Sequence, residues 1–266
     1  MSGRMRQVIT LLTDFGTRDY FVASMKGVIL SINPDAVVID ITHDVPSFNV
    51  LKAAFILWAT YRYYPRGTVH VAVVDPGVGT SRRALAIRSR NYYFIGPDNG
   101  VLTMAAEDDG VVEVREISNR SVMLGEVSST FHGRDIFAPA AAHIGLIRFE
   151  DYGPLVRDYV KLTMPEPRLE GGVIKAQVVY VDKFGNVFTS IRRGMFNIGY
   201  GDLLAVNVKG RLIRLRVNRS YGYVNRGEAL ALFNSMNFLE LAVNGGSFAE
   251  EYGLSEGDQV EVAVVH

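Results

Sequence analysis

The chain has 266 residues, 48% of them hydrophobic and 21% charged, which is enough to bury one large core or two modest ones. Its 28 basic and 28 acidic residues cancel, which argues against an overall attraction to nucleic acid or to an anionic membrane. The absence of cysteine excludes disulfides, thiol nucleophiles and thiolate metal ligands. With no signal-peptide pattern and no run of about 18 apolar residues, we expect a cytoplasmic protein without a membrane span.

Short apolar runs alternate with helical patterns in the first part of the chain. Continuous apolar or β-branched runs predict strands at 7–13, 36–41 and 68–74, of the kind that is buried on both faces. Apolar residues recur at spacings of three and four over 20–32 and 50–61, which predicts two helices. This order of strands and helices is typical of a mostly parallel sheet with crossover helices.

The same pattern continues with three more strands and one more helix. We predict the strands at 84–88, 92–95 and 111–117, and the helix over 134–147. Pro139 indicates that this helix starts late or is kinked. The segment 95–103 is expected to be a polar turn. Together these elements predict an N-terminal α/β domain at residues 1–163.

The pattern changes at residues 164–172, where proline and glycine are frequent and periodicity is lost, so this segment is predicted to be a linker. Beyond it, strand-like segments are separated by turn residues. Ile213, Leu215 and Val217, for example, alternate with period two. The sequence therefore predicts a smaller C-terminal domain at residues 173–266, an antiparallel β-barrel.

Polar residues follow each of the first three predicted strands. Asp14 follows the first, with Asp19 five residues on, Asp40 and His43 close the second, and Asp75 ends the third. Ligands of open α/β sheets bind outside the carboxyl ends of the strands, so these clusters indicate a site for hydroxyls, a cation or a metal. Taken singly, each residue fits equally well as a helix cap or turn residue.

The stretch VVDPGVGTSRR at 73–83 contains two glycines but is not a dinucleotide fingerprint, because Arg82 stands where the third glycine belongs. We expect the glycines to allow tight turning of the backbone beside a ligand. His132 and Arg134 precede a predicted helix, where the histidine fits a general base, a cap partner or a packed ring. The five histidines lack the spacing of a zinc site, so no metal is predicted.

In the second domain, the segment VDKFGNVFTSI at 181–191 surrounds a glycine turn with an acid, an amide and two aromatic rings. Such groups suit a planar heterocycle, by stacking and hydrogen bonding. An ordinary hairpin explains the same pattern.

Six segments, in order along the chain, carry a resemblance to a known family. They are TDFGTRDYFVASMKGVI, VVDPGVGTSRR, FIGPDNGVLT, STFHGRDIFAP, DKFGNVFTSI and FNSMNFLELAVNGGS. Over nearly its whole length the chain resembles the S-adenosyl-L-methionine (SAM) hydroxide adenosyltransferases, relatives of the enzymes that make fluoro- and chloro-deoxyadenosine. The resemblance implies hydrolysis of SAM to adenosine and L-methionine, by attack of water or hydroxide at ribose C5′, with no cofactor and no metal.

The resemblance also implies a catalytic set of Asp75, Arg82 and His132. The halogenating relatives have an aromatic residue in place of this aspartate, so its presence disfavours the use of halide. Arg82 would stabilise developing hydroxide, and Asp75 would hold Arg82 or accept a hydrogen bond. His132 is the better base near neutral pH, but pairing of hydroxide with arginine competes, so the proton acceptor is left open.

For the substrate, the resemblance implies roles for three residues of the first domain. Asp14 would hold the ribose hydroxyls, Asp19 would lie beside the methionine end, and Phe48 would line the ribose and methionine pocket.

Five residues of the second domain match as well. Asp182 would pair with the methionine ammonium, Asn186 and Phe188 would contact adenine, Ser235 the methionine carboxylate, and Gly245 adenine through its backbone.

One residue departs from the family pattern. Met236 stands where relatives often have arginine, so a carboxylate anchor is expected to be missing or to come from elsewhere. The resemblance further implies a homotrimer with sites between subunits. Two alternatives to a hydrolase remain, namely a SAM-dependent halogenase using chloride and a non-catalytic protein that binds adenosine or SAM.

Overall fold

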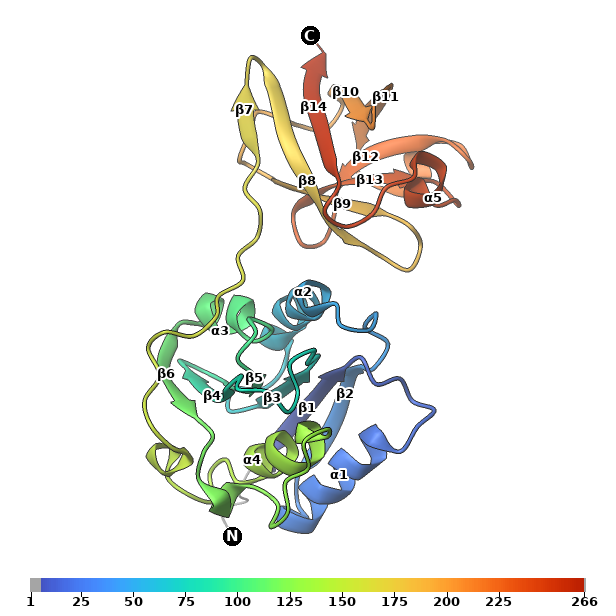
Figure 1. Ribbon diagram of the computed structural model, residues 1–266. Coiled ribbons are helices and arrows are strands. Elements are labelled where there is room, and N and C mark those ends of the chain that lie inside the picture. Colours follow the sequence, from blue (N-terminus) through green and yellow to red (C-terminus); the bar gives the residue numbers. More distant parts are fainter. Residues whose placement is uncertain (1–5, 266) are drawn as a thin grey trace. The chain divides into compact units, whose positions relative to one another are not determined.

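The structure, a computed structural model, describes residues 6–265 and consists of two compact units that divide between Leu162 and Thr163 (Figure 1). The segment expected to be a linker, 164–172, contains a short strand, β7 (Arg168–Glu170), which pairs with the first long strand of the second unit. No helix in the described part of the chain is long and apolar enough to cross a membrane.

The first unit is built on a six-stranded sheet with the order β2-β1-β3-β5-β4-β6. Its strands are β1 (Val8–Thr13), β2 (Val37–Thr42), β3 (Val69–Val73), β4 (Ala84–Ser89), β5 (Tyr93–Pro97) and β6 (Val111–Glu116). The β1–β2, β1–β3 and β3–β5 pairs are parallel, whereas β4 is antiparallel to both of its neighbours. The predicted α/β domain with a mostly parallel sheet is therefore confirmed.

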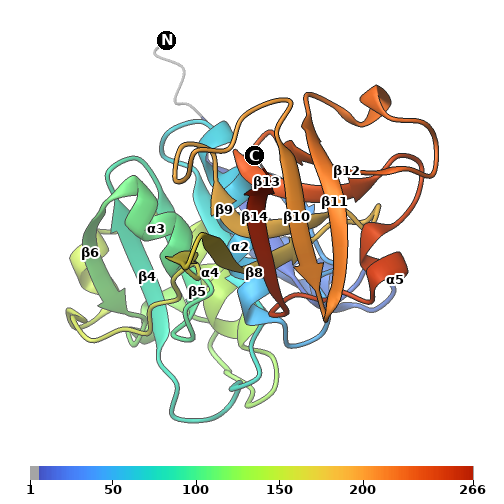
Figure 2. The ribbon, with the colours of Figure 1, turned by 90° about the horizontal axis from the view of Figure 1, so that it is seen from above.

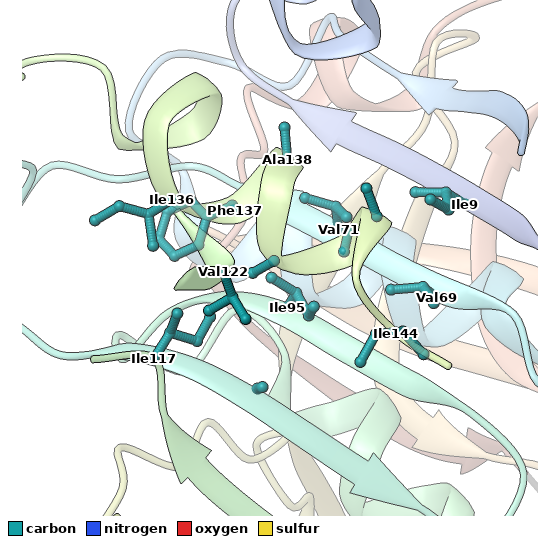
Figure 3. Close-up of a cluster of buried hydrophobic side chains, with 14 of the residues drawn as sticks. Ile9, Val69, Val71, Ile95, Ile117, Val122, Ile136, Phe137, Ala138 and Ile144 are labelled. Carbon is teal, nitrogen blue, oxygen red and sulfur yellow. The ribbon is translucent and has the colours of Figure 1, made fainter. Parts of the chain in front are cut away.

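Helices cover both faces of this sheet (Figure 1). They are α1 (Phe21–Ile32), α2 (Val50–Thr60), α3 (Thr103–Asp109) and α4 (Ala138–Ala142). Helices α1 and α4 share one core cluster with strand residues such as Ile9 and Val71, and Figure 3 shows part of this cluster. Helices α2 and α3 share a cluster on the other face with Leu12 and Ala72. The strands are apolar on both faces because both faces are covered.

The helix predicted over 134–147 is divided and shorter. A π-helical turn, Gly133–Phe137, leads into α4, which has Pro139 in its first turn, where the missing N–H costs nothing. Of the two expected outcomes, a late start or a kink, the late start holds for the α-helical part only, which begins at Ala138 after the π-helical turn. The predicted end is wrong, because α4 stops at Ala142 and Gly145 has a positive φ of 80°. The sequence did not predict α3, whose seven residues are too few to show a helical period.

The second unit is a closed barrel of seven strands. They are β8 (Val173–Val181), β9 (Val187–Arg192), β10 (Leu203–Val208), β11 (Arg211–Asn218), β12 (Ala229–Phe233), β13 (Phe238–Val243) and β14 (Gln259–Val265). The order β14-β10-β11-β12-β13-β9-β8 closes through pairing of β14 with β8, and Figure 2 shows β8, β14, β10 and β11 side by side. All neighbours are antiparallel except β11 and β12, so the predicted barrel is confirmed with one parallel pair.

Short helical segments complete the two units. They are α5 (Phe248–Tyr252) and the 3₁₀ turns Tyr61–Tyr63, Arg120–Val122, Phe149–Tyr152 and Tyr221–Tyr223. In the barrel, alternate residues such as Leu204, Val206 and Val208 point inward and are buried, as the period-two pattern predicts.

Candidate active site

Asp75, Arg82 and His132 form one hydrogen-bonded chain in the first unit. Arg82 Nε donates to Asp75 Oδ1 at 2.9 Å and to Oδ2 at 3.0 Å, and Arg82 Nη2 makes a further short bond to Oδ2. The same Nη2 donates to His132 Nδ1 at 2.9 Å. The Asp75 and Arg82 side chains are only 5% and 11% exposed, so this ion pair is shielded from water. The structure thus brings together the three residues predicted as the catalytic set.

A close approach of two loops makes this chain possible. Asp75 and Arg82 belong to the loop between β3 and β4, and His132 to the loop before the π-helical turn. Gly79 has a φ of 76°, and a Cβ there would lie 2.2 Å from the carbonyl oxygen of Ser129. Only glycine allows this backbone contact, which supports the interpretation of the loop glycines as permitting tight turns.

His132 is neutral at pH 7 and has one ring nitrogen occupied. A guanidinium only donates, so Nδ1 of His132 accepts, and the proton of the neutral ring is on Nε2. Burial and the charge of Arg82 lower the pKa of His132, against the opposing effects of Asp75, Asp135 and a hydrogen bond with the backbone of Ser128. A general base accepts a proton on a lone pair, and the only ring lone pair of His132, on Nδ1, is therefore engaged by Arg82.

Asp135 is a fully buried residue that orders the loop carrying His132. It accepts hydrogen bonds from Ser128 N at 2.8 Å, from Ser128 Oγ at 2.6 Å and from Arg134 Nε at 2.6 Å. Burial alone would raise the pKa of Asp135, but the hydrogen bonds from Arg134 and Ser128 hold it below the usual value. The sequence reasoning missed Asp135. Its position next to Arg134, in a segment that resembles the family, was the available signal.

A pocket of about 310 Å³ opens beside the catalytic set. It is lined by Asp14, Phe15, Phe21, Ser47, Phe48, Val73, Asp75, Val78, Thr130, Phe131, His132 and Gly133. Asp14 Oδ2 accepts from the backbone N–H of Phe48 at 2.8 Å. Phe48 has an unusual φ of 67° and is 69% exposed. The pocket therefore contains two of the predicted substrate residues, whereas Asp19 is exposed and does not line it.

Asp40 and His43 were expected to belong to a binding site at the ends of the strands. They do not line the pocket but support the loop beside it. His43 Nδ1 lies 2.8 Å from Thr13 Oγ1, and the carbonyl of His43 accepts from the N–H of Gly16 at 2.8 Å. Asp40 Oδ1 lies 3.0 Å from His43 Nε2. These contacts join the loop that carries Asp14 to the end of β2.

The second unit has a pocket of its own, of about 610 Å³. It is lined by Asp182, Phe184, Asn186, Tyr221, Val243, Asn244, Gly245, Gly246 and Ser247. Asp182 Oδ1 accepts from the N–H groups of Phe184 and Asn186 at 2.8 and 2.9 Å, and Oδ2 accepts from Asn186 Nδ2 at 2.8 Å. Asp182, Asn186 and Gly245, all predicted from the resemblance, therefore line one pocket, whereas Tyr221 was not predicted.

Two predicted substrate residues of the second unit do not line this pocket. Phe188 is half-buried on β9, with its ring centre 5.4 Å from that of Tyr180. Ser235 is exposed in the turn between β12 and β13, next to Met236. Their contacts with substrate stay predictions. Within residues 6–265, no three His, Asp or Glu side chains are grouped so that they could hold a metal ion.

The chain matches two family models that together span most of its length. Residues 9–150 match the SAM hydroxide adenosyltransferase N-terminal domain, and residues 176–261 match the C-terminal domain.

Similar proteins agree with these matches. The chain is 40% identical to an (R)-S-adenosyl-L-methionine hydrolase of Salinispora tropica, with 96% of this chain and 97% of the relative covered. It is 30% identical to a fluorinase of Actinopolyspora mzabensis, with 97% of each chain covered. A crystal structure of an uncharacterized conserved protein from Thermotoga maritima superposes with a TM-score of 0.90 at 42% identity, over 96% of this chain and 99% of that one. The two domain matches and these identities place the chain in the SAM hydroxide adenosyltransferase family.

Proposed function

We propose that the protein hydrolyses SAM to adenosine and L-methionine by attack of water at ribose C5′. The observation that carries this proposal is the chain Asp75–Arg82–His132, two members of which line the pocket that also contains Asp14. Relatives named (R)-S-adenosyl-L-methionine hydrolase, at 33–40% identity over 96% of this chain, support the same reaction.

The main requirement of this reaction is that the protein aligns the attacking water with C5′. The sulfonium makes C5′ electrophilic, and methionine leaves as a neutral thioether, so the leaving group needs no general acid. The protein must hold one desolvated water about 3 Å from C5′, opposite the sulfur. A shielded carboxylate and guanidinium beside the pocket suit this task, because they can fix the water's orientation.

We propose that Asp75 accepts the proton that the attacking water loses. As the oxygen–C5′ bond forms, the C5′–sulfur bond breaks and its electron pair stays on sulfur. While the oxygen–C5′ bond forms, the attacking water loses one proton to the Asp75 carboxylate, which lines the pocket, so the oxygen gains partial hydroxide character. His132 is not the acceptor, because its single ring lone pair, on Nδ1, is held by Arg82, whereas Oδ1 of Asp75 accepts one hydrogen bond from Arg82 and keeps a second lone pair. Arg82 stabilises the oxygen as negative charge develops.

We propose that both pockets bind parts of the substrate. Asp14 holds the ribose hydroxyls, with Phe48 over the ribose and Asp19 near the methionine end. In the second unit, Asp182 pairs with the ammonium group, while Asn186, Phe188 and Gly245 contact adenine.

Ser235 contacts the methionine carboxylate. The next residue is Met236, so the carboxylate lacks the arginine contact that relatives often have at this position. The reaction needs no cofactor. We further propose that the enzyme is a cytoplasmic homotrimer with sites between subunits. The absence of cysteine fits a reducing compartment.

Incubation with SAM in halide-free buffer containing ¹⁸O water and EDTA tests the reaction. We expect adenosine that carries the label in its 5′ oxygen, together with methionine. Asp75→Ala should lower turnover by at least about 100-fold and leave adenosine binding within about threefold, since it removes the proton acceptor and not the nucleoside contacts. A halogenated nucleoside on addition of chloride would identify a halogenase, and binding of adenosine without any turnover would identify a binding protein.

A further inference from the structure

Tyr221 at the pocket of the second unit is hydrogen-bonded to the buried residue Glu240. Tyr221 lies between β11 and β12, lines the pocket and is 39% exposed. Its hydroxyl donates to Oε1 of Glu240 on β13 at 2.7 Å. Glu240 is only 1% exposed, which is unusual for a carboxylate because its desolvation is costly without compensation.

This hydrogen bond fixes what Tyr221 offers to a ligand. A phenol has one proton, and here that proton is given to Glu240. The oxygen of Tyr221 therefore presents only lone pairs to the pocket. Asp182, which lines the same pocket, is likewise an acceptor when ionised. Both groups therefore favour a ligand group that carries N–H donors.

The surroundings of the pair are anionic. The groups that act on the pKa of Glu240 are Tyr221, Asn234 and Asp182, and none of them is a cation. Burial and Asp182 raise the pKa of Glu240, and Glu240 and Asp182 both raise that of Tyr221. The ion pairs found among residues 6–265 do not include Glu240. A cationic donor group on the ligand would supply the missing positive charge.

We propose that Tyr221 is a specificity residue for the α-ammonium group of the substrate, together with Asp182, and that Glu240 is the positioning residue that holds Tyr221 as an acceptor. The proposal rests on SAM being the substrate, and it adds to the reaction a second contact for the amino acid end. It predicts that the pair distinguishes ligands by their ammonium group and not by their nucleoside.

Steady-state kinetics with SAM and binding of adenosine, which has no ammonium group, test this proposal. Tyr221→Phe should raise KM for SAM about tenfold or more, since a hydrogen bond to a charged group is lost, and leave kcat within about twofold. Glu240→Leu should raise KM similarly, because it frees the Tyr221 proton to point at the ammonium group. Glu240→Gln keeps an acceptor for Tyr221 and should restore much of the affinity.

Controls separate a recognition role from a structural one. The Kd of adenosine and the KM of a deamino analogue of SAM should change by less than about twofold in all three variants. An unchanged KM for SAM in Tyr221→Phe, or an equal loss of adenosine affinity, would overturn the proposal while SAM hydrolysis by the unmodified protein still stood. Absence of SAM hydrolysis by the unmodified protein would instead overturn the proposed function.

Discussion

His132 is held by Arg82 through the ring nitrogen that a general base would need. His132 Nδ1 lies 2.9 Å from Arg82 Nη2, the ring is neutral, and Arg82 is largely buried. His132 therefore acts as a hydrogen-bond acceptor that keeps the guanidinium in place. Arg82 also lies 5.2 Å from the ring centre of Phe137, so it is held from a second side. This arrangement supports the proposal that His132 positions Arg82 and that Asp75 is the group that contacts the attacking water.

His132→Asn tests this assignment, because the amide oxygen of asparagine lies close to where Nδ1 of histidine lies. An acceptor for Arg82 is then kept, and we expect kcat to fall by less than about tenfold. Loss of a general base would instead lower kcat by about 10²- to 10⁴-fold. His132→Ala is the matched control and should cost much more than His132→Asn. Equal and large losses in both variants would contradict the positioning role.

Individual residues differ in how far the sequence could predict them. Asp75, Arg82 and His132 were found because each lies in a segment that resembles the family. Glu240 was not, because in FLELAV a single acid between apolar residues looks like an outward-facing strand position. Its burial depends on Tyr221, 19 residues away, and so on the closed barrel. Tertiary contacts of this kind leave no pattern in the local sequence.

Two loops and a π-helical turn, more than any single strand or helix, build the catalytic set. The loop between β3 and β4 lies against residue 129 because Gly79 has no side chain, and Gly133 begins the turn that follows His132. π-Helical turns are rare and are often found at functional sites. The strands that end at these loops were predicted to within two residues, whereas the turn was not, since it has no periodicity of its own.

Gly79→Ala should separate these two loops. A Cβ would lie 2.2 Å from the Ser129 carbonyl oxygen, so the backbone must move and the bond from Arg82 to His132 must lengthen. We expect kcat to fall by about tenfold or more, measured by adenosine release, because misplacement of about 1 Å has effects of that size or larger. Gly67→Ala is the matched control, since Gly67 also has a positive φ but has nothing within 4 Å of its Cβ. Equal activity in the two variants would contradict the role of this contact.

At the scale of the whole molecule, the predicted site residues belong to two separate units. Asp75 belongs to the first unit and Asp182 to the second, and each lines a pocket within its own unit. The sequence predicted both the α/β unit and the barrel, since each has its own period of apolar residues. It did not predict the short elements, such as β7 and α5, which consist of three and five residues.

Sites between the subunits of a homotrimer can be tested by mixing two inactive variants. Asp75→Ala damages only the first unit, and Asp182→Ala only the second. If each site combines the first unit of one subunit with the second unit of a neighbour, random mixed trimers made at equal amounts contain intact sites. One half of the first units and one half of the second units are intact, so about one quarter of full activity should return after the variants are unfolded and refolded together. Light scattering should give about three times the 29.4 kDa of one chain. Activity that stays at the level of the separate variants, in a confirmed mixed trimer, would show that each site lies within one chain.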